Sequence, residues 1–193
     1  MALVAQQLFK LGVSTCLVVL AGASCKGREG AAAGDSGSAS DGGGGMAVAE
    51  ADSAMRAAMA DSANWPSYGR DYTNQRYSPL TEITPANAQG LSLAWKYKTG
   101  IPNAFEASPV VVNGVMYVST PLNHVEALDA RTGQKKWEYA AKLGTTVHCC
   151  GPVNRGVAVY GNRVYMGQLD GKLVALDAAN GNKVWEVQVG DPQ

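Results

Sequence analysis

The sequence predicts an all-β chain built from four-stranded antiparallel units, and three observations support this prediction. Short apolar runs alternate with polar residues at a period near two, which is typical of strands with one buried face. Turn dipeptides such as Asn113-Gly114 and Gly161-Asn162 separate these runs, and such dipeptides favour tight hairpins. A long motif also recurs at a fixed distance along the chain, which indicates repeated structural units.

The repeated motif places Ala, Asp, Gly and Trp at matching positions in two segments. The first is Ala127-Leu128-Asp129-Ala130-Arg131-Thr132-Gly133, which leads to Trp137, and the second is Ala175-Leu176-Asp177-Ala178-Ala179-Asn180-Gly181, which leads to Trp185. Ala127 and Ala175 stand 48 residues apart, as do Trp137 and Trp185. A period of this size with four short strands per unit is typical of β-propeller blades.

The strands of the first unit are expected at residues 109–112, 115–118, 124–128 and 135–139, and those of the second at 157–160, 164–166, 173–176 and 183–187. Trp137 and Trp185 end their units, and we expect each ring to be structural and to pack on the neighbouring blade. A closed propeller needs about four to eight blades. We therefore expect residues 64–193 to be the N-terminal part of a longer, eight-bladed protein, with about two blades present here.

Residues 1–25 have the pattern of an export signal. Lys10 precedes an apolar stretch over 11–23, and small residues follow it. Two processing routes stay open: ordinary cleavage after Ala23, or lipidation of Cys25 in the lipobox-like run 22–25, which would attach the protein to a membrane face. Both routes predict a protein of the periplasm or cell envelope, an oxidising compartment in which disulfides form.

Residues 26–63 are rich in Gly, Ser and Ala and are predicted to be a linker, disordered or partly helical, with a short marginal helix over 47–61. The 16 basic and 16 acidic residues of the chain cancel. Because a nucleic-acid partner would require a basic stripe, none is expected. The two histidines, His124 and His148, do not have the spacing of metal ligands.

Cys149 and Cys150 are adjacent, and a bond between them would be unusual. Consecutive α-carbons are about 3.8 Å apart, whereas a disulfide prefers about 5.5 Å, so the bond would close a small strained ring. Strained bridges are the labile or functional ones. Two neighbouring buried thiols are the alternative, and the dipeptide alone does not decide between them.

The repeat Ala-x-Asp-x-x-x-Gly-x-x-x-Trp resembles that of pyrroloquinoline quinone (PQQ)-dependent dehydrogenases. Residues 64–80 are similar to the entry segment of that family, and the similarity continues through Leu93-Ala94-Trp95. Non-catalytic propellers, including outer-membrane-assembly lipoproteins, carry the repeat too. Its combination with Cys149-Cys150 and Asn154-Arg155-Gly156 is more specific and resembles the methanol and ethanol dehydrogenase branch.

The resemblance implies roles for four residues. Cys149 and Cys150 match a disulfide that lies against the planar quinone, and Glu106 matches a carboxylate that hydrogen-bonds the cofactor. Arg155 matches a basic residue that contacts the cofactor, whose three carboxylates suit a guanidinium. The alternatives are a solvated loop charge for Glu106 and a surface Arg for Arg155. Gly151 departs from the acidic residue that many relatives have after the cysteine pair.

The resemblance also implies an activity: oxidation of primary alcohols to aldehydes by hydride transfer to PQQ, with calcium or a lanthanide as Lewis acid. The catalytic Asp and the metal ligands are expected beyond Gln193, so none is assigned in this chain, which alone is expected to be inactive. A c-type cytochrome is the expected electron acceptor. A non-catalytic propeller scaffold and a quinoprotein acting on sugars or polyols are the alternative functions.

Overall fold

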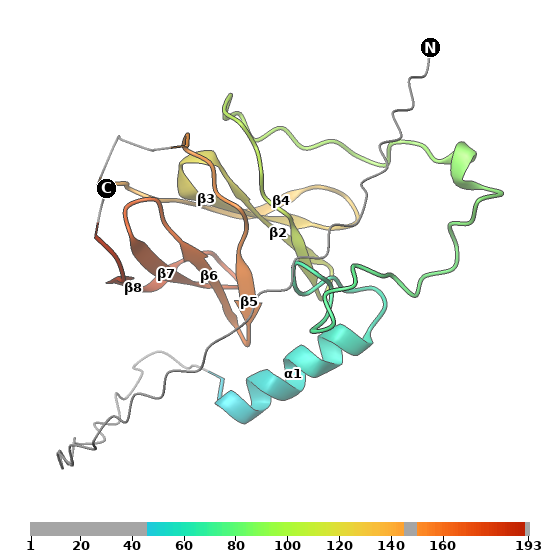
Figure 1. The fold of residues 1–193 in the computed structure, drawn as a ribbon, viewed down its shortest axis with the longest axis horizontal. Helices are drawn as coiled ribbons and strands as arrows, with labels where there is room; N and C mark the ends of the chain where they lie inside the picture. The colour runs from blue at the N-terminus through green and yellow to red at the C-terminus, as the bar shows by residue number, and fades with distance from the viewer. Residues whose placement is uncertain (1–45, 145–149, 192–193) are drawn as a thin grey trace, which may run out of the picture. The chain divides into compact units, whose positions relative to one another are not determined.

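The computed structural model describes residues 46–144 and 150–191 and contains two four-stranded antiparallel sheets. The first blade consists of β1 (Val110–Val112), β2 (Val115–Thr120), β3 (His124–Asp129) and β4 (Lys135–Ala140). The second consists of β5 (Ala158–Tyr160), β6 (Arg163–Gly167), β7 (Lys172–Asp177) and β8 (Lys183–Gln188). Each blade is a meander in which every strand pairs with the next (Figure 1). The predicted all-β class and strand positions are confirmed.

The two blades share a β-bulge at the same position of the repeat. Asn113 and Gly114 take positive φ values of 51° and 75°, as a two-residue hairpin of the first blade requires. The β3–β4 register shifts between Ala127 and Leu128, and the β7–β8 register shifts at the equivalent Ala175 and Leu176. The sequence repeat therefore corresponds to a structural repeat that includes the same bulge.

Trp137 joins the two blades. The residue is 8% exposed, and its indole N–H donates to the Ala178 carbonyl of the second blade at 3.0 Å. The ring also lies on Gly181, where an added Cβ would approach a ring atom to 2.5 Å. Only glycine fits there, which explains the Gly of the repeated motif. The packing expected of Trp137 against the neighbouring blade is confirmed.

Trp95 makes the same contact one unit earlier. Its indole N–H donates to the Ala130 carbonyl at 3.3 Å, and a Cβ added to Gly133 would lie 2.5 Å from its ring. Trp95 therefore packs on the first blade as Trp137, from β4, packs on the second. Trp185, at the equivalent position of β8, is 37% exposed.

The predicted helix is present as α1 (Val48–Ala60), and its Ala51 and Ala58 are buried. Tyr160 of β5 donates its hydroxyl proton to the helix, either to Asp52 Oδ1 at 2.7 Å or to the Val48 carbonyl at 3.2 Å. Short 3₁₀ turns lie at Ala88–Gly90 (η1) and Pro121–Asn123 (η2).

Among the described residues, no helix has the length and apolar character needed to cross a membrane. The export signal over residues 1–25 and the lipidation of Cys25 concern residues outside the described ranges. These assignments, and the domain boundaries at 25 and 63, stay predictions.

Candidate functional site

A groove with a volume of about 990 Å³ opens beside the second blade. Its walls come from Tyr68, from residues between 106 and 110, from the β4–β5 loop and β5 between 150 and 158, and from β6 to β7 between 165 and 173. Segments that are far apart in the sequence therefore meet at one concave surface.

Glu106, Cys150 and Arg155 all line this groove. The Nη2 atom of Arg155 lies 3.5 Å from Oε2 of Glu106, and these side chains are 83% and 48% exposed. An ion pair this exposed adds little to stability, about 0–1 kcal/mol. The arrangement instead leaves a guanidinium on the groove wall, with most of its surface open to a ligand.

Cys149 lies outside the described residues, so its bond to Cys150 stays a prediction. Cys150 is exposed and belongs to the groove wall. The structure thus brings three of the four sequence-predicted cofactor residues to one surface.

The backbone around Arg155 explains the sequence Asn-Arg-Gly. The Ser108 N–H donates to the Arg155 carbonyl at 3.5 Å, which aligns the segment carrying Glu106 with the one carrying Arg155. Gly156 has a φ of 142°, and a Cβ added there would lie 3.4 Å from the Ser108 carbonyl oxygen. A side chain at position 156 would therefore be strained, which favours glycine directly after Arg155.

Two further polar residues line the groove, and the sequence motifs assign neither of them a contact with a cofactor. Asn154 and Gln168 are only 9% and 8% exposed. Gln168 Nε2 donates to the Tyr139 hydroxyl at 3.3 Å, and its Oε1 has no partner among the residues described. Gln168 falls in register with Thr120 of the first blade. This change of residue type within the repeat is the signal that could have marked the position.

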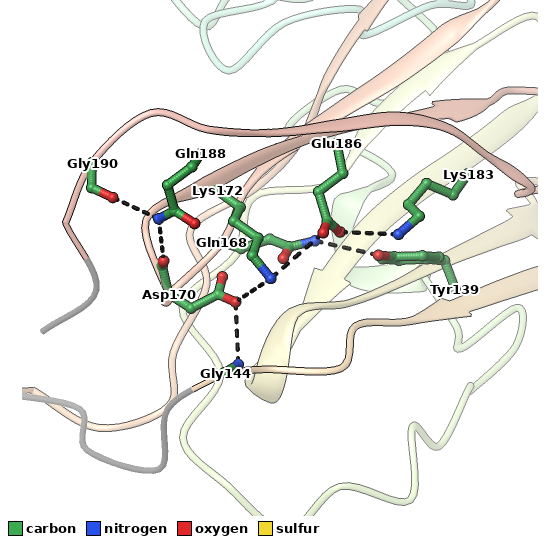
Figure 2. A network of polar contacts seen from close by, with 9 residues as sticks. All are labelled: Tyr139, Gly144, Gln168, Asp170, Lys172, Lys183, Glu186, Gln188 and Gly190. Atoms are coloured by element: carbon green, nitrogen blue, oxygen red, sulfur yellow. Dashed lines mark hydrogen bonds and ion pairs between the residues drawn. The ribbon is translucent and has the colours of Figure 1, made fainter.

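Asp170, in the β6–β7 turn directly after the groove residues Gln168 and Leu169, is the centre of a polar network (Figure 2). Its side chain is 2% exposed, and Oδ2 accepts the Gly144 N–H at 3.2 Å and lies 3.0 Å from Lys172 Nζ. Gln188 Nε2 of β8 donates to the Asp170 carbonyl at 2.8 Å. The network therefore ties the turn to the β4–β5 loop on one side and to β8 on the other.

Charge within this network favours ionised Asp170. Burial works to raise the pKa of Asp170, but the hydrogen bonds from Lys172 and the Gly144 N–H outweigh it and hold the pKa below the ordinary 3.8. A depressed folded-state pKa means that this carboxylate contributes stability above its unfolded pKa, and that the contribution disappears as pH falls through the folded value.

Replacing Asp170 with Asn is expected to lower the free energy of unfolding at pH 7 by about 1.5–3 kcal/mol, because a charged hydrogen-bond acceptor is lost. The difference from the wild type should shrink as pH falls below about 4, where the carboxyl of the unfolded chain begins to take up a proton, and should vanish below the lower folded-state pKa. Urea unfolding at several pH values measures both effects. Asp191→Asn at an exposed position is the control, and a deficit that does not change with pH would contradict the assignment.

Within residues 46–144 and 150–191, no three His, Cys, Asp or Glu side chains gather closely enough to hold a metal ion. What the groove offers is an exposed guanidinium, a carboxylate beside it, a cysteine at the rim and buried amide groups. The exposed guanidinium suits a ligand that carries a carboxylate.

The sequence profile of the PQQ family, described as the glucose/ethanol/alcohol dehydrogenase β-propeller domain, matches residues 65–187. A quinohemoprotein alcohol dehydrogenase of Comamonas testosteroni is 46% identical over 134 residues, which are 68% of this chain and 19% of that protein. A 1-butanol dehydrogenase (cytochrome c) of Thauera butanivorans is 48% identical over 126 residues, 63% of this chain and 18% of that protein.

Solved structures show the same similarity. The quinohemoprotein alcohol dehydrogenase ADHIIG of Pseudomonas putida HK5 aligns with a TM-score of 0.67 at 44% identity, over 72% of this chain and 21% of that one. A europium-containing methanol dehydrogenase aligns with a TM-score of 0.66 at 35% identity, over 71% and 25% of the two chains.

The chain spans about a fifth of the length of the curated relatives that it matches, at 19% and 18% of the two. The profile match includes Trp95, all the residues that line the groove and both blades up to residue 187 of β8. The chain therefore belongs to the PQQ family of glucose/ethanol/alcohol dehydrogenase β-propeller domains.

Proposed function

We propose that the protein carrying this chain is a PQQ- and metal-dependent dehydrogenase that oxidises primary alcohols to aldehydes, and that this chain forms one wall of the cofactor site. The observation that carries the proposal is the convergence of Glu106, Cys150 and Arg155 on one groove. Relatives named as alcohol dehydrogenases, at 46% and 48% identity, support the choice of substrate class.

The residues of the groove fit PQQ in charge and in size. PQQ carries three carboxylates, and the exposed Arg155 guanidinium can bind one of them through two parallel hydrogen bonds. The volume of about 990 Å³ lies at the upper end of the range of small-molecule sites, about 300–1,000 Å³. Glu106 would repel a carboxylate by itself, but Arg155 stands 3.5 Å away and compensates its charge.

When bound, PQQ supplies the quinone that accepts hydride from the alcohol carbon, with calcium or a lanthanide as Lewis acid. In this proposal Arg155 orients the cofactor through a carboxylate, and Glu106 orients Arg155. Cys150, joined to Cys149, would offer a rigid surface for the ring.

The europium in the methanol dehydrogenase relative supports keeping a lanthanide beside calcium as the proposed metal. The name of the Thauera relative supports a c-type cytochrome as the proposed electron acceptor. Export to the periplasm or cell envelope, from the pattern of residues 1–25, belongs to the same proposal.

The test is dye-linked oxidation by the whole gene product, purified after export and reconstituted with PQQ and either calcium or a lanthanide. Methanol, ethanol, 1-butanol and glucose are compared as substrates. The proposal expects dye reduction that requires both PQQ and metal and is fastest with a primary alcohol. Activity with glucose alone would support the sugar or polyol alternative. A product that neither binds PQQ nor reduces dye would support the scaffold alternative.

A further inference from the structure

We infer that Asn154 is a positioning residue, which fixes Arg155 in the groove through hydrogen bonds to Gly156, to Gly167 of the second blade and to the buried Asn123 of the first. The inference rests on the proposed function, because it takes Arg155 to be the group that binds a carboxylate of the ligand. In this role Asn154 acts on the ligand through its neighbour Arg155.

The orientation of the Asn154 amide follows from two backbone partners. Its Oδ1 accepts the Gly156 N–H at 3.1 Å, and its Nδ2 donates to the Gly167 carbonyl at 3.0 Å. A backbone N–H only donates and a carbonyl only accepts, so these contacts determine which end of the amide is oxygen. The second N–H of Nδ2 donates to Asn123 Oδ1 at 3.0 Å. Both amide protons of Asn154 are therefore used within the protein.

The contact with Gly156 closes a turn in which Arg155 is the central residue. An Asn side chain that accepts the N–H two residues later holds the intervening backbone in a fixed shape. The Arg155 carbonyl is held from the other side by the Ser108 N–H at 3.5 Å. The backbone of Arg155 is thus fixed while its side chain stays 83% exposed toward the groove. Such preorganisation lowers the entropy that is lost when a ligand binds.

The first blade supplies the other half of the network from the turn η2 between β2 and β3. Asn123 is fully buried there, and the neighbouring Leu122 N–H donates to the Pro152 carbonyl at 2.8 Å. Leu122 and Asn123 take φ values of 63° and 58°, a left-handed conformation that is uncommon for leucine. One turn of the first blade therefore holds the loop of the second blade at two points, Pro152 and Asn154.

The experiment compares PQQ affinity in the whole gene product for Asn154→Ala, Arg155→Ala and the double variant, by quenching of tryptophan fluorescence. Asn154→Ala should weaken binding by about tenfold, as expected for the loss of about one buried hydrogen bond. In the Arg155→Ala background the same change should have an effect of less than about twofold, because the residue acts through Arg155.

Two further variants separate positioning from folding. Asn64 is 4% exposed and accepts the Asn113 N–H at 2.8 Å away from the groove, so Asn64→Ala removes a comparable buried amide and should leave PQQ affinity unchanged. Asn123→Gly removes the acceptor for Asn154 while tolerating the positive φ, and should weaken PQQ binding by about threefold, a milder loss than that of Asn154→Ala.

Amide hydrogen exchange of Gly156 and Ser108 provides a readout that does not need the cofactor. Asn154→Ala should accelerate exchange at both positions, and unchanged rates would overturn the inference. Equal losses of affinity from Asn154→Ala with and without Arg155 would also overturn it, because they would show a purely structural role. If the wild-type protein does not bind PQQ, the proposed function fails, while the exchange rates still decide whether Asn154 fixes the turn.

Discussion

Replacing Trp137 with alanine is expected to destabilise the chain by about 3–5 kcal/mol, the usual range for removing a large buried aromatic ring. The residue is 8% exposed, and its ring packs on Gly181 and contacts Tyr117 with centroids 5.8 Å apart. Its removal would also leave the Ala178 carbonyl without the indole N–H at 3.0 Å. Because these contacts join the blades, the midpoint of urea unfolding should fall and the two blades should lose their cooperative unfolding.

Trp185→Ala is the matched control, because Trp185 has the same position in the repeat and packs on Tyr165 at 5.9 Å, but is 37% exposed. Its replacement should lower the free energy of unfolding by about 1–2 kcal/mol, since Trp185 is already partly exposed to solvent and buries less apolar area. Far-ultraviolet circular dichroism measures the urea unfolding of both variants. Equal unfolding midpoints for the two would contradict the role of Trp137 as the contact between blades.

Replacing Arg155 with alanine is expected to weaken PQQ binding by about ten- to hundredfold, because hydrogen bonds to charged groups contribute about 1.5–3 kcal/mol. The guanidinium stands on the groove wall with 83% of its side chain exposed, so its removal should affect the ligand far more than the fold. Arg155→Lys should recover part of the affinity, since lysine keeps the charge but lacks the planar fork.

Arg131→Ala provides the charge control, because Arg131 is exposed in the β3–β4 turn and does not line the groove. Both alanine variants remove one positive charge, and only the loss of Arg155 should change the affinity strongly. Affinities measured at two salt concentrations separate general attraction from a local contact. Equal weakening by the two variants would contradict a direct role for Arg155.

Much of the fold could be predicted because its determinants are local. Asn113-Gly114 specifies a hairpin within four residues. The period of two matches the burial of β6, where Val164 and Met166 alternate with less buried neighbours, whereas β2 and β3 are buried over four consecutive residues. The contact of Trp137 with Gly181 follows from the repeat, once a blade is recognised. The contact of Tyr160 with α1 could not be predicted, since Tyr160 and Asp52 are 108 positions apart in the sequence.

The site residues likewise fall into two groups, those that sequence motifs identify and those that only the structure shows. Glu106, Cys150 and Arg155 were identified through a resemblance between motifs, and the structure then brought them to one groove. Asn154 and Asp170 were missed because polar residues in loops are usually solvated, and their burial depends on how loops of two blades pack. No local sequence pattern shows that Asn154 meets Asn123 across the blades.

The most direct test of the account is the crystal structure of the whole gene product with PQQ bound. We expect the cofactor to occupy the groove, with a carboxylate hydrogen-bonded to the Arg155 guanidinium and one ring face against a joined Cys149–Cys150 pair. PQQ bound at a different surface, with Glu106 and Arg155 exposed to solvent and the two cysteines as separate thiols, would contradict it.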